Sequence, residues 1–95
     1  MTRYTVVWDQ DVQGPFTSAW VAGDSQMRAT LTAIANWVDA NLAVDPDQKG
    51  QLRPDHVTRV IAVPAPNSQA RVSAAYQVFA DDRQVRVICV VFRGS

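Results

Sequence analysis

Four arginines in the second half of the sequence have the greatest potential for chemistry. Arg59, Arg71, Arg86 and Arg93 lie in segments where polar and apolar residues alternate, the pattern typical of β-strands. Strands held side by side would point their guanidinium groups at one phosphate backbone, as nucleic-acid-binding proteins and metal-independent ribonucleases both require. The alternative is a solvated sheet face whose arginines pair with nearby aspartates.

The charge distribution favours an anionic partner for this half of the chain. The formal net charge of the 95 residues is zero, but it is unevenly placed. Residues 1–48 hold two arginines against six aspartates, a net charge of −4, and residues 49–95 hold seven cations against three aspartates, a net charge of +4. Such asymmetry is typical of proteins that bind anions, although eight Arg to one Lys also fits a compositional bias of the source.

Other catalytic groups are scarce. His56 is the one imidazole, and it is either a general acid or base near the arginines or an exposed structural residue after Pro54 and Asp55. Cys89, the one cysteine, lies in an apolar run that predicts a packed hydrophobic residue. A metal site needs several convergent ligands and a nucleotide site a glycine-rich loop, so we predict neither a metal nor a cofactor.

The length and composition predict a single domain over residues 1–95. With 47% apolar and 19% charged residues the chain resembles an ordinary globular protein. No run of eighteen apolar residues predicts a membrane span, and the first residues do not form an export signal. We therefore expect a cytoplasmic protein.

The first half predicts a strand and one or two helices. Residues 3–8 alternate as a strand does, whereas Gly14 and Pro15 predict irregular structure over 9–18, with a possible short helix over 16–22. A long helix is expected over about 24–43, capped by Asp24 or Ser25 and stopped at Asp45-Pro46. Five apolar residues form its buried stripe: Met27, Leu31, Ile34, Val38 and Leu42.

The second half predicts a three-stranded antiparallel meander over 57–63, 71–79 and 84–92, the last two joined by a short polar hairpin link. Strict alternation places two sets of residues under the long helix: Val72, Ala74, Tyr76 and Val78 from one strand, and Val85, Val87, Cys89 and Val91 from the next. It places Arg71 and Arg86 on the opposite face, together with Ile88, Val90 and Phe92. The predicted fold class is α+β, with a strand, one or two helices and then the meander.

Three stretches resemble the RelE/ParE superfamily of bacterial type II toxins, often described as plasmid stabilisation proteins. They are the opening strand Tyr4-Thr-Val-Val-Trp8, the helix end Ile34-Ala-Asn-Trp-Val-Asp-Ala-Asn-Leu-Ala-Val-Asp-Pro46 with Gly50 close behind, and the hairpin from Val72 to Val87. The hairpin is the most specific, with Tyr and Val, an acidic turn and then Val-x-Val on the returning strand. The resemblance spans the chain from Tyr4 to Arg93.

The resemblance implies a toxin that a cognate antitoxin holds inactive. It implies one of two targets when the toxin is free: messenger RNA on the ribosome, cleaved by basic side chains without a metal, or DNA gyrase. For the first target Arg71 and Arg93 would be catalytic, and Arg59, Arg86 and His56 would join them in binding RNA. A non-catalytic binding protein of the same fold is the alternative, because Ser73 stands where the cleaving branch commonly keeps an arginine and the sequence ends at Ser95 without that branch's closing helix and tyrosine. A nucleic-acid-binding domain unrelated to toxins is a third possibility.

Overall fold

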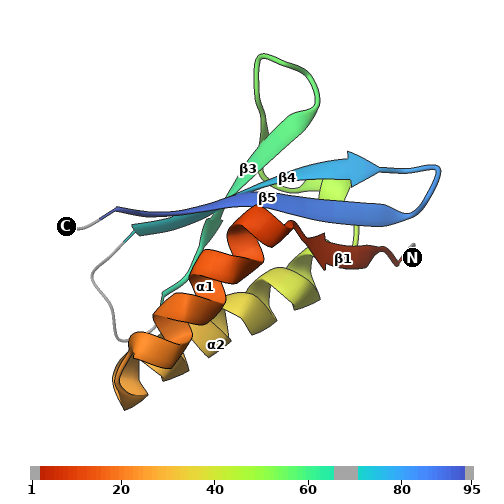
Figure 1. The fold of residues 1–95 in the computed structure, drawn as a ribbon. Helices are drawn as coiled ribbons and strands as arrows, with labels where there is room; N and C mark the ends of the chain where they lie inside the picture. The colour runs from red at the N-terminus through yellow and green to blue at the C-terminus, as the bar shows by residue number, and fades with distance from the viewer. Residues whose placement is uncertain (1–2, 66–70, 94–95) are drawn as a thin grey trace.

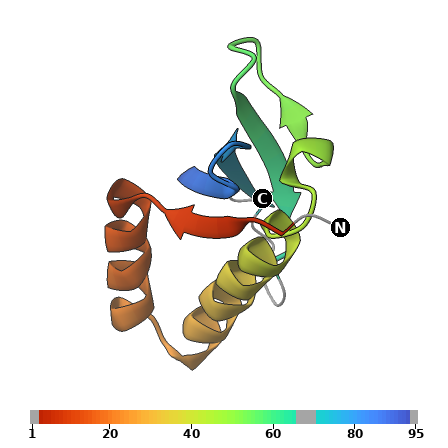
Figure 2. The same cartoon turned by 90° about the vertical axis from the view of Figure 1, so that its right-hand side faces the viewer.

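A computed structural model describes residues 3–65 and 71–93. Over these residues two helices lie against one face of a five-stranded sheet (Figures 1 and 2). The elements are β1 (Thr5–Trp8), α1 (Gln10–Ala22), α2 (Ser25–Leu42), the 3-10 turn η1 (Pro46–Gln48), β2 (Gln51–Leu52), β3 (Thr58–Val63), β4 (Arg71–Phe79) and β5 (Gln84–Arg93). The α+β prediction is confirmed.

The sheet has the order β1-β5-β4-β3-β2. The predicted meander forms its centre, since β3 pairs with β4 and β4 with β5, both antiparallel. The first strand joins the sheet by pairing in parallel with β5, from Thr5 opposite Gln84 to Trp8 opposite Val87. The two-residue strand β2, which the sequence did not predict, extends the other edge. A parallel pair needs a long crossover, and here the two helices and the meander provide it.

Helix α2 begins and ends close to where the sequence predicts. The carboxylate of Asp24 caps it by accepting a hydrogen bond of 2.8 Å from the backbone N–H of Met27. Four residues of the predicted stripe are buried: Leu31, Ile34, Val38 and Leu42. Met27, the first of the stripe, is 48% exposed, so the prediction was wrong there. The apolar stripe of α2 is longer than the surface that covers it.

Helix α1 corrects the expectation of irregular structure over residues 9–18. The helix runs from Gln10 through Gly14 and Pro15 to Ala22. The carboxylate of Asp9 caps it at the backbone N–H of Asp11, and buried Val12 anchors it to the rest of the molecule. Pro15, the sixth residue of the helix, removes one internal hydrogen bond and its ring crowds the carbonyl of Asp11, a cost that the cap and this packing offset. The Trp8 and Phe16 rings, with centroids 5.5 Å apart, add a contact between β1 and α1.

A β-bulge in β5 changes which of its residues face the helices. Ala75 pairs with Cys89 but Tyr76 pairs with Val87, so Ile88 is an extra residue in β5. Before the bulge, Val85 and Val87 face the helices and are fully buried, as predicted. After it the alternation is reversed. Val90 and Phe92 pair with the buried residues Ala74 and Val72, whereas Cys89 and Val91 share the opposite, outer face.

The bulge therefore overturns the predicted face of every β5 residue after Val87. Cys89 is exposed rather than packed, and Val91 is 37% exposed rather than covered by the helix. Val90 and Phe92, predicted on the outer face, turn to the helix side instead. Strict alternation fails because the extra residue Ile88 turns the residues that follow it to the face opposite the predicted one.

Tyr76 fixes the segment between α2 and β2 to the core. Its side chain is fully buried, and its hydroxyl lies 2.9 Å from the carbonyl oxygen of Pro46 and 2.8 Å from that of Lys49. Burial raises the pKa of this phenol, and the nearby positive charge of Arg59 partly opposes that effect. Gly50 lies in the same segment and has a φ of 66°. A Cβ added at this residue would lie 2.6 Å from the carbonyl oxygen of Val60. The segment thus depends on both a phenol and a glycine.

Candidate functional site

The outer face of the sheet carries three of the predicted arginines. Arg71 and Arg93 are directly opposite each other in the pairing of β4 with β5, so their side chains leave the same face side by side. Arg86 pairs with Gln77 on the same face, six residues along β4 from Arg71, which is about 20 Å in a strand. All three side chains are exposed, and none hydrogen-bonds within the described part of the chain.

Arg59 does not belong to this group. It pairs with Tyr76, so it projects from the helix-side face of β3. Its guanidinium donates a hydrogen bond of 3.0 Å to the carbonyl oxygen of Lys49, the same oxygen that Tyr76 contacts. Arg59 therefore helps to hold the segment after α2, and a partner on the outer face would not meet it.

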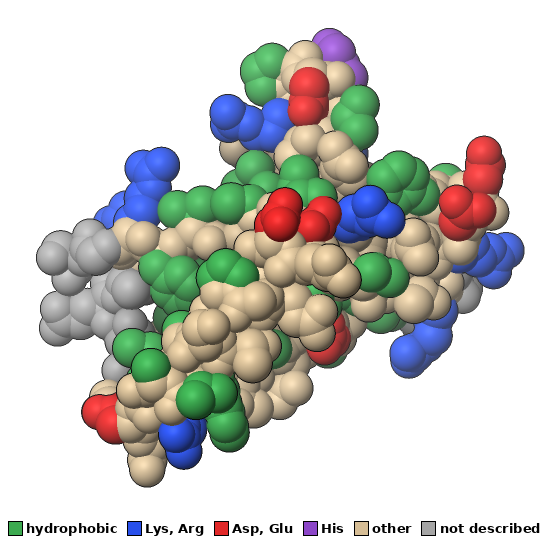
Figure 3. Space-filling view, in the orientation of Figure 1, with side chains coloured by type: hydrophobic (Ala, Val, Ile, Leu, Met, Phe, Trp, Pro, Cys, Tyr) green, Lys and Arg blue, Asp and Glu red, His purple; other side chains and the backbone are tan. Residues whose placement is uncertain are grey.

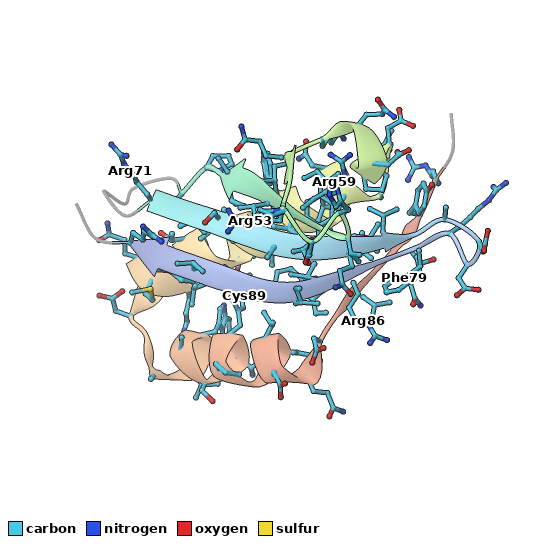
Figure 4. The ribbon with its side chains drawn as sticks, turned by 90° about the horizontal axis from the view of Figure 1, so that it is seen from above. Arg53, Arg59, Arg71, Phe79, Arg86 and Cys89 are labelled. Atoms are coloured by element: carbon cyan, nitrogen blue, oxygen red, sulfur yellow. The ribbon has the colours of Figure 1, made fainter. Side chains whose placement is uncertain are left out.

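The β2–β3 hairpin adds a different arginine to the outer face. Figure 4 looks down on this face and shows Arg53 over the middle of the sheet, between Arg71 at one end and Arg86 at the other. Alternation of polar and apolar residues did not reveal Arg53, because this residue lies in a loop and not in a strand. The short apolar pair Leu52 and Val57 flanking a Pro-Asp turn was the signal for a hairpin.

His56 lies at the exposed tip of that hairpin, with a positive φ of 62°. Asp55 fixes the tip by accepting hydrogen bonds from the backbone N–H groups of Val57 and Thr58 and from the Thr58 hydroxyl. These bonds lower the pKa of Asp55 to about 2. The hairpin stands away from the sheet (Figure 1), so His56 is not beside the Arg71 and Arg93 pair.

The outer face can bind an anion but has few groups for proton transfer. Between its arginines lie small or apolar side chains: Ala62, Ser73, Ala75, Cys89 and Val91. An arginine stabilises a phosphate by charge and by paired hydrogen bonds, but it stays protonated and cannot act as a general base. No group of three or more His, Cys or Asp side chains that could hold a metal occurs among the described residues.

A second candidate surface is a groove on the other side of β5. It has a cavity volume of about 660 Å³ and lies between α1, the start of α2 and the last residues of β5. Its lining is mainly apolar and includes Phe16, Met27, Leu31, Val90 and Phe92. None of the helices in the described ranges is long and apolar enough to cross a membrane.

Solved structures with the same architecture are toxin–antitoxin proteins. A structure of the chromosomal ParDE system of Pseudomonas aeruginosa matches with a TM-score of 0.70 and 12% identity, covering 98% of each chain. The RelBE2 complex of Mycobacterium tuberculosis matches with a TM-score of 0.63 and 15% identity, covering 100% of this chain and 97% of that one. A variant of the Escherichia coli toxin RelE, in complex with a peptide of its antitoxin, matches with a TM-score of 0.52 and 18% identity, covering 99% and 86%.

The similarity lies in the structure rather than in the sequence. No protein-family model matches the chain, and no curated protein matches it significantly. The structural matches nevertheless extend over nearly the whole chain, and they agree with the three stretches that resembled this superfamily. The chain therefore has the RelE/ParE toxin fold.

Proposed function

We propose that this chain is the toxin component of a type II toxin–antitoxin module. The observation that carries the proposal is the match of almost the entire chain to toxin–antitoxin structures. Two open surfaces suit such a role: the outer sheet face with its arginines and the apolar groove beside β5. One surface would meet a target and the other would be available to an antitoxin.

The outer face supports a target that is a large anionic molecule or assembly. Arg71 and Arg93 form a pair at one end, Arg53 lies over the centre and Arg86 lies near the other end. This row of cations over a surface of small side chains would follow an extended phosphate backbone. Ribosome-bound messenger RNA and DNA gyrase with its DNA both present such a surface.

A second candidate function is binding without RNA cleavage. Cleavage of RNA through the 2′-hydroxyl needs a group that accepts a proton, and the residues beside the Arg71 and Arg93 pair are Ser73 and Val91. His56, the natural proton acceptor, lies at the hairpin tip. This arrangement favours a toxin that acts by occupying its target, as gyrase inhibition would require, over a nuclease.

Growth measurements test the proposal directly. We expect induction of the chain in bacteria to lower the colony count at least tenfold, and co-expression of the protein from the adjacent reading frame to restore it. The double variant Arg71→Ala/Arg93→Ala should lose most of the toxicity because it removes the paired cations. Arg3→Ala removes an exposed arginine that precedes β1 and bridges to Val44, away from the β4–β5 pair, and serves as the control. Full growth during expression of soluble wild-type chain in several hosts would contradict the proposal.

Two assays on purified protein separate the targets. Ribosome-dependent cleavage of messenger RNA, abolished by Arg71→Ala or Arg93→Ala, would identify a nuclease. Inhibition of gyrase supercoiling without any RNA cleavage would identify a gyrase toxin. Binding to an antitoxin with neither activity would identify the non-catalytic alternative.

A further inference from the structure

The end of the outer face beside the β4–β5 turn carries an exposed aromatic ring. Phe79 is 37% exposed. Its neighbour in β4, Val78, packs against the core, so alternation along the strand turns Phe79 to the outer face. Figure 4 shows Phe79 near Arg86, at the opposite end of the face from Arg71. Neither packing in the core nor binding of phosphate by the arginines accounts for this ring.

Polar side chains without internal partners surround the ring. Gln84 is the direct cross-strand partner of Phe79, and Gln77 and Arg86 form the next pair on the same face, about 7 Å along the strands. None of these three polar side chains hydrogen-bonds to another group within residues 3–65 and 71–93. Each glutamine amide offers both donors and an acceptor, whereas the guanidinium offers donors alone.

An aromatic ring beside two amides and a cation matches the chemistry of a nucleobase. The flat face of a base stacks on an aromatic side chain, and its edge carries the donors and acceptors that amides bind. An apolar protein surface placed on Phe79 would instead take Gln77 and Gln84 out of water without giving them partners, at a cost for each amide. The surroundings of Phe79 therefore suit a base better than they suit an apolar surface.

The arginines would lead a phosphate backbone to this ring. Arg86 lies about 20 Å from Arg71 along the strands, a distance that a few nucleotides of an extended single strand span. Past Phe79 the chain turns through Asp81 and Asp82, whose carboxylates repel phosphate. A strand that follows the arginines thus reaches its last cation on this path at Arg86, where the ring is available to a base.

The ring requires an unpaired base. In a duplex each base is stacked on its neighbours and its pairing edge is occupied, so a free face and a free edge occur together only in single strands, loops and ends. Recognition of bases in this state is the usual way in which proteins bind RNA, because the grooves of an RNA helix give side chains little access to the bases.

We propose that the outer face holds a subsite for one unpaired base of single-stranded RNA, formed by Phe79, Gln77, Gln84 and Arg86. The ring of Phe79 stacks on the base, the two glutamines hydrogen-bond to its edge and Arg86 binds the adjoining phosphate. This inference rests on the proposed function, because it names the class of molecule that the target face takes. It concerns binding and holds whether or not the RNA is cut.

Binding of a fluorescently labelled single-stranded RNA to the purified chain, followed by anisotropy, tests the subsite. Phe79→Leu keeps an apolar side chain but removes the aromatic face, and should raise Kd by roughly fivefold to a hundredfold. Phe79→Trp keeps an aromatic face and should bind at least as tightly as the wild type. Phe92→Leu is the matched control, because Phe92 is 46% exposed but turns to the helix side of the sheet. Thermal melting confirms that each variant is folded.

Two further measurements separate stacking from charge. The variant Arg71→Ala/Arg93→Ala should weaken binding and reduce its dependence on salt, whereas Phe79→Leu should weaken binding and leave the salt dependence unchanged. An RNA of the same length that lacks its bases should bind the wild type and Phe79→Leu with equal affinity, because it offers nothing to stack.

The outcomes distinguish this inference from the proposed function. Wild-type affinity in Phe79→Leu, an equal loss in Phe92→Leu, or no RNA binding by a wild-type chain that arrests growth would overturn the subsite and leave the toxin proposal intact. A DNA strand of the same sequence bound as tightly as the RNA would overturn the assignment to RNA. Absence of growth arrest would overturn the proposed function, whatever the result for Phe79.

Discussion

The two halves of β5 belong to one strand but have different surroundings. Residues 84–87 lie between two strands, and their inward side chains Val85 and Val87 are fully buried. Residues 88–93 are more apolar, with five apolar residues of six against two of four in residues 84–87, yet Val91 and Phe92 are 37% and 46% exposed. Hydrophobicity therefore does not determine burial here. What differs is the partner strand on the outer edge, which β1 supplies to the first half alone.

The bulge at Ile88 marks the boundary between these halves. It lies where β1 ends and α1 begins, and it brings Val90 and Phe92 to the groove while turning Cys89 and Val91 to the outer face. One inserted residue thus gives the first half a role in the core and the second half a role at two surfaces. We infer that the first half contributes mainly to the stability of the fold and the second half mainly to the binding of a partner.

The largest expected effect is on the free energy of unfolding, which a substitution in the first half of β5 should lower far more than one in the second half. Val87→Asp buries an unpaired charge at a fully buried position and should cost more than about 4 kcal/mol, enough to unfold much of the protein. Val91→Asp, at an exposed position on the same strand, should cost about 1 kcal/mol or less. Urea denaturation followed by circular dichroism measures both. Equal destabilisation by the two variants would contradict the division of β5.

A smaller effect is expected at Tyr76, which pairs with Val87 just before the bulge. Tyr76→Phe removes the hydroxyl that contacts the carbonyl oxygens of Pro46 and Lys49, and should cost about 1 to 2 kcal/mol. Arg59 still donates to the Lys49 oxygen, so the segment keeps one contact. The same denaturation experiment measures this loss.

The pH dependence of stability provides a second measure of Tyr76. Burial raises its pKa in the folded protein above the ordinary value of 10.0, so the folded state holds the phenol proton more tightly than the unfolded state does. Stability from this group is complete below pH 10 and falls as the pH rises through the folded-state pKa. Tyr76→Phe should lack that component of the alkaline loss. An identical alkaline profile in wild type and variant would show that Tyr76 is solvated in the folded protein.

Local sequence patterns predicted the secondary structure where one signal acted alone. The Asp24 cap and the spacing of Leu31, Ile34 and Val38 defined α2, and simple alternation gave the bounds of β4. The α1 region failed because Gly14 and Pro15 suggested a break that the Asp9 cap and the burial of Val12 outweigh. The burial of Val12 is a tertiary contact that no local pattern contains, whereas the Asp9 cap is local and was the available signal for a helix start.

The candidate site was predicted only in part for a related reason. Alternation placed Arg71 and Arg86 on one face, and they share it. Arg93, which strict alternation would put on the helix side with Val91, joins them because it follows the bulge. Arg59 lies on the other face, since its pairing with Tyr76 depends on the register between strands. The groove depends on where β1 stops along β5, and that parallel pairing is set by the whole chain rather than by either strand.

The smallest perturbation that still distinguishes the halves of β5 is chemical labelling of Cys89. After the bulge Cys89 is exposed on the outer face of the sheet, so its thiol should react with a thiol reagent in the native protein without denaturant. In a Cys89→Ser background, Val87→Cys places a thiol at a fully buried position, which should react only when the protein unfolds.

The two rates, measured by mass spectrometry in the same buffer, should differ by at least about a hundredfold, because reaction at position 87 requires an opening with a cost of several kcal/mol. A slow reaction at Cys89 in the free chain would mean that this half is covered without any partner. The division of β5 into a core half and an exposed half would then not hold.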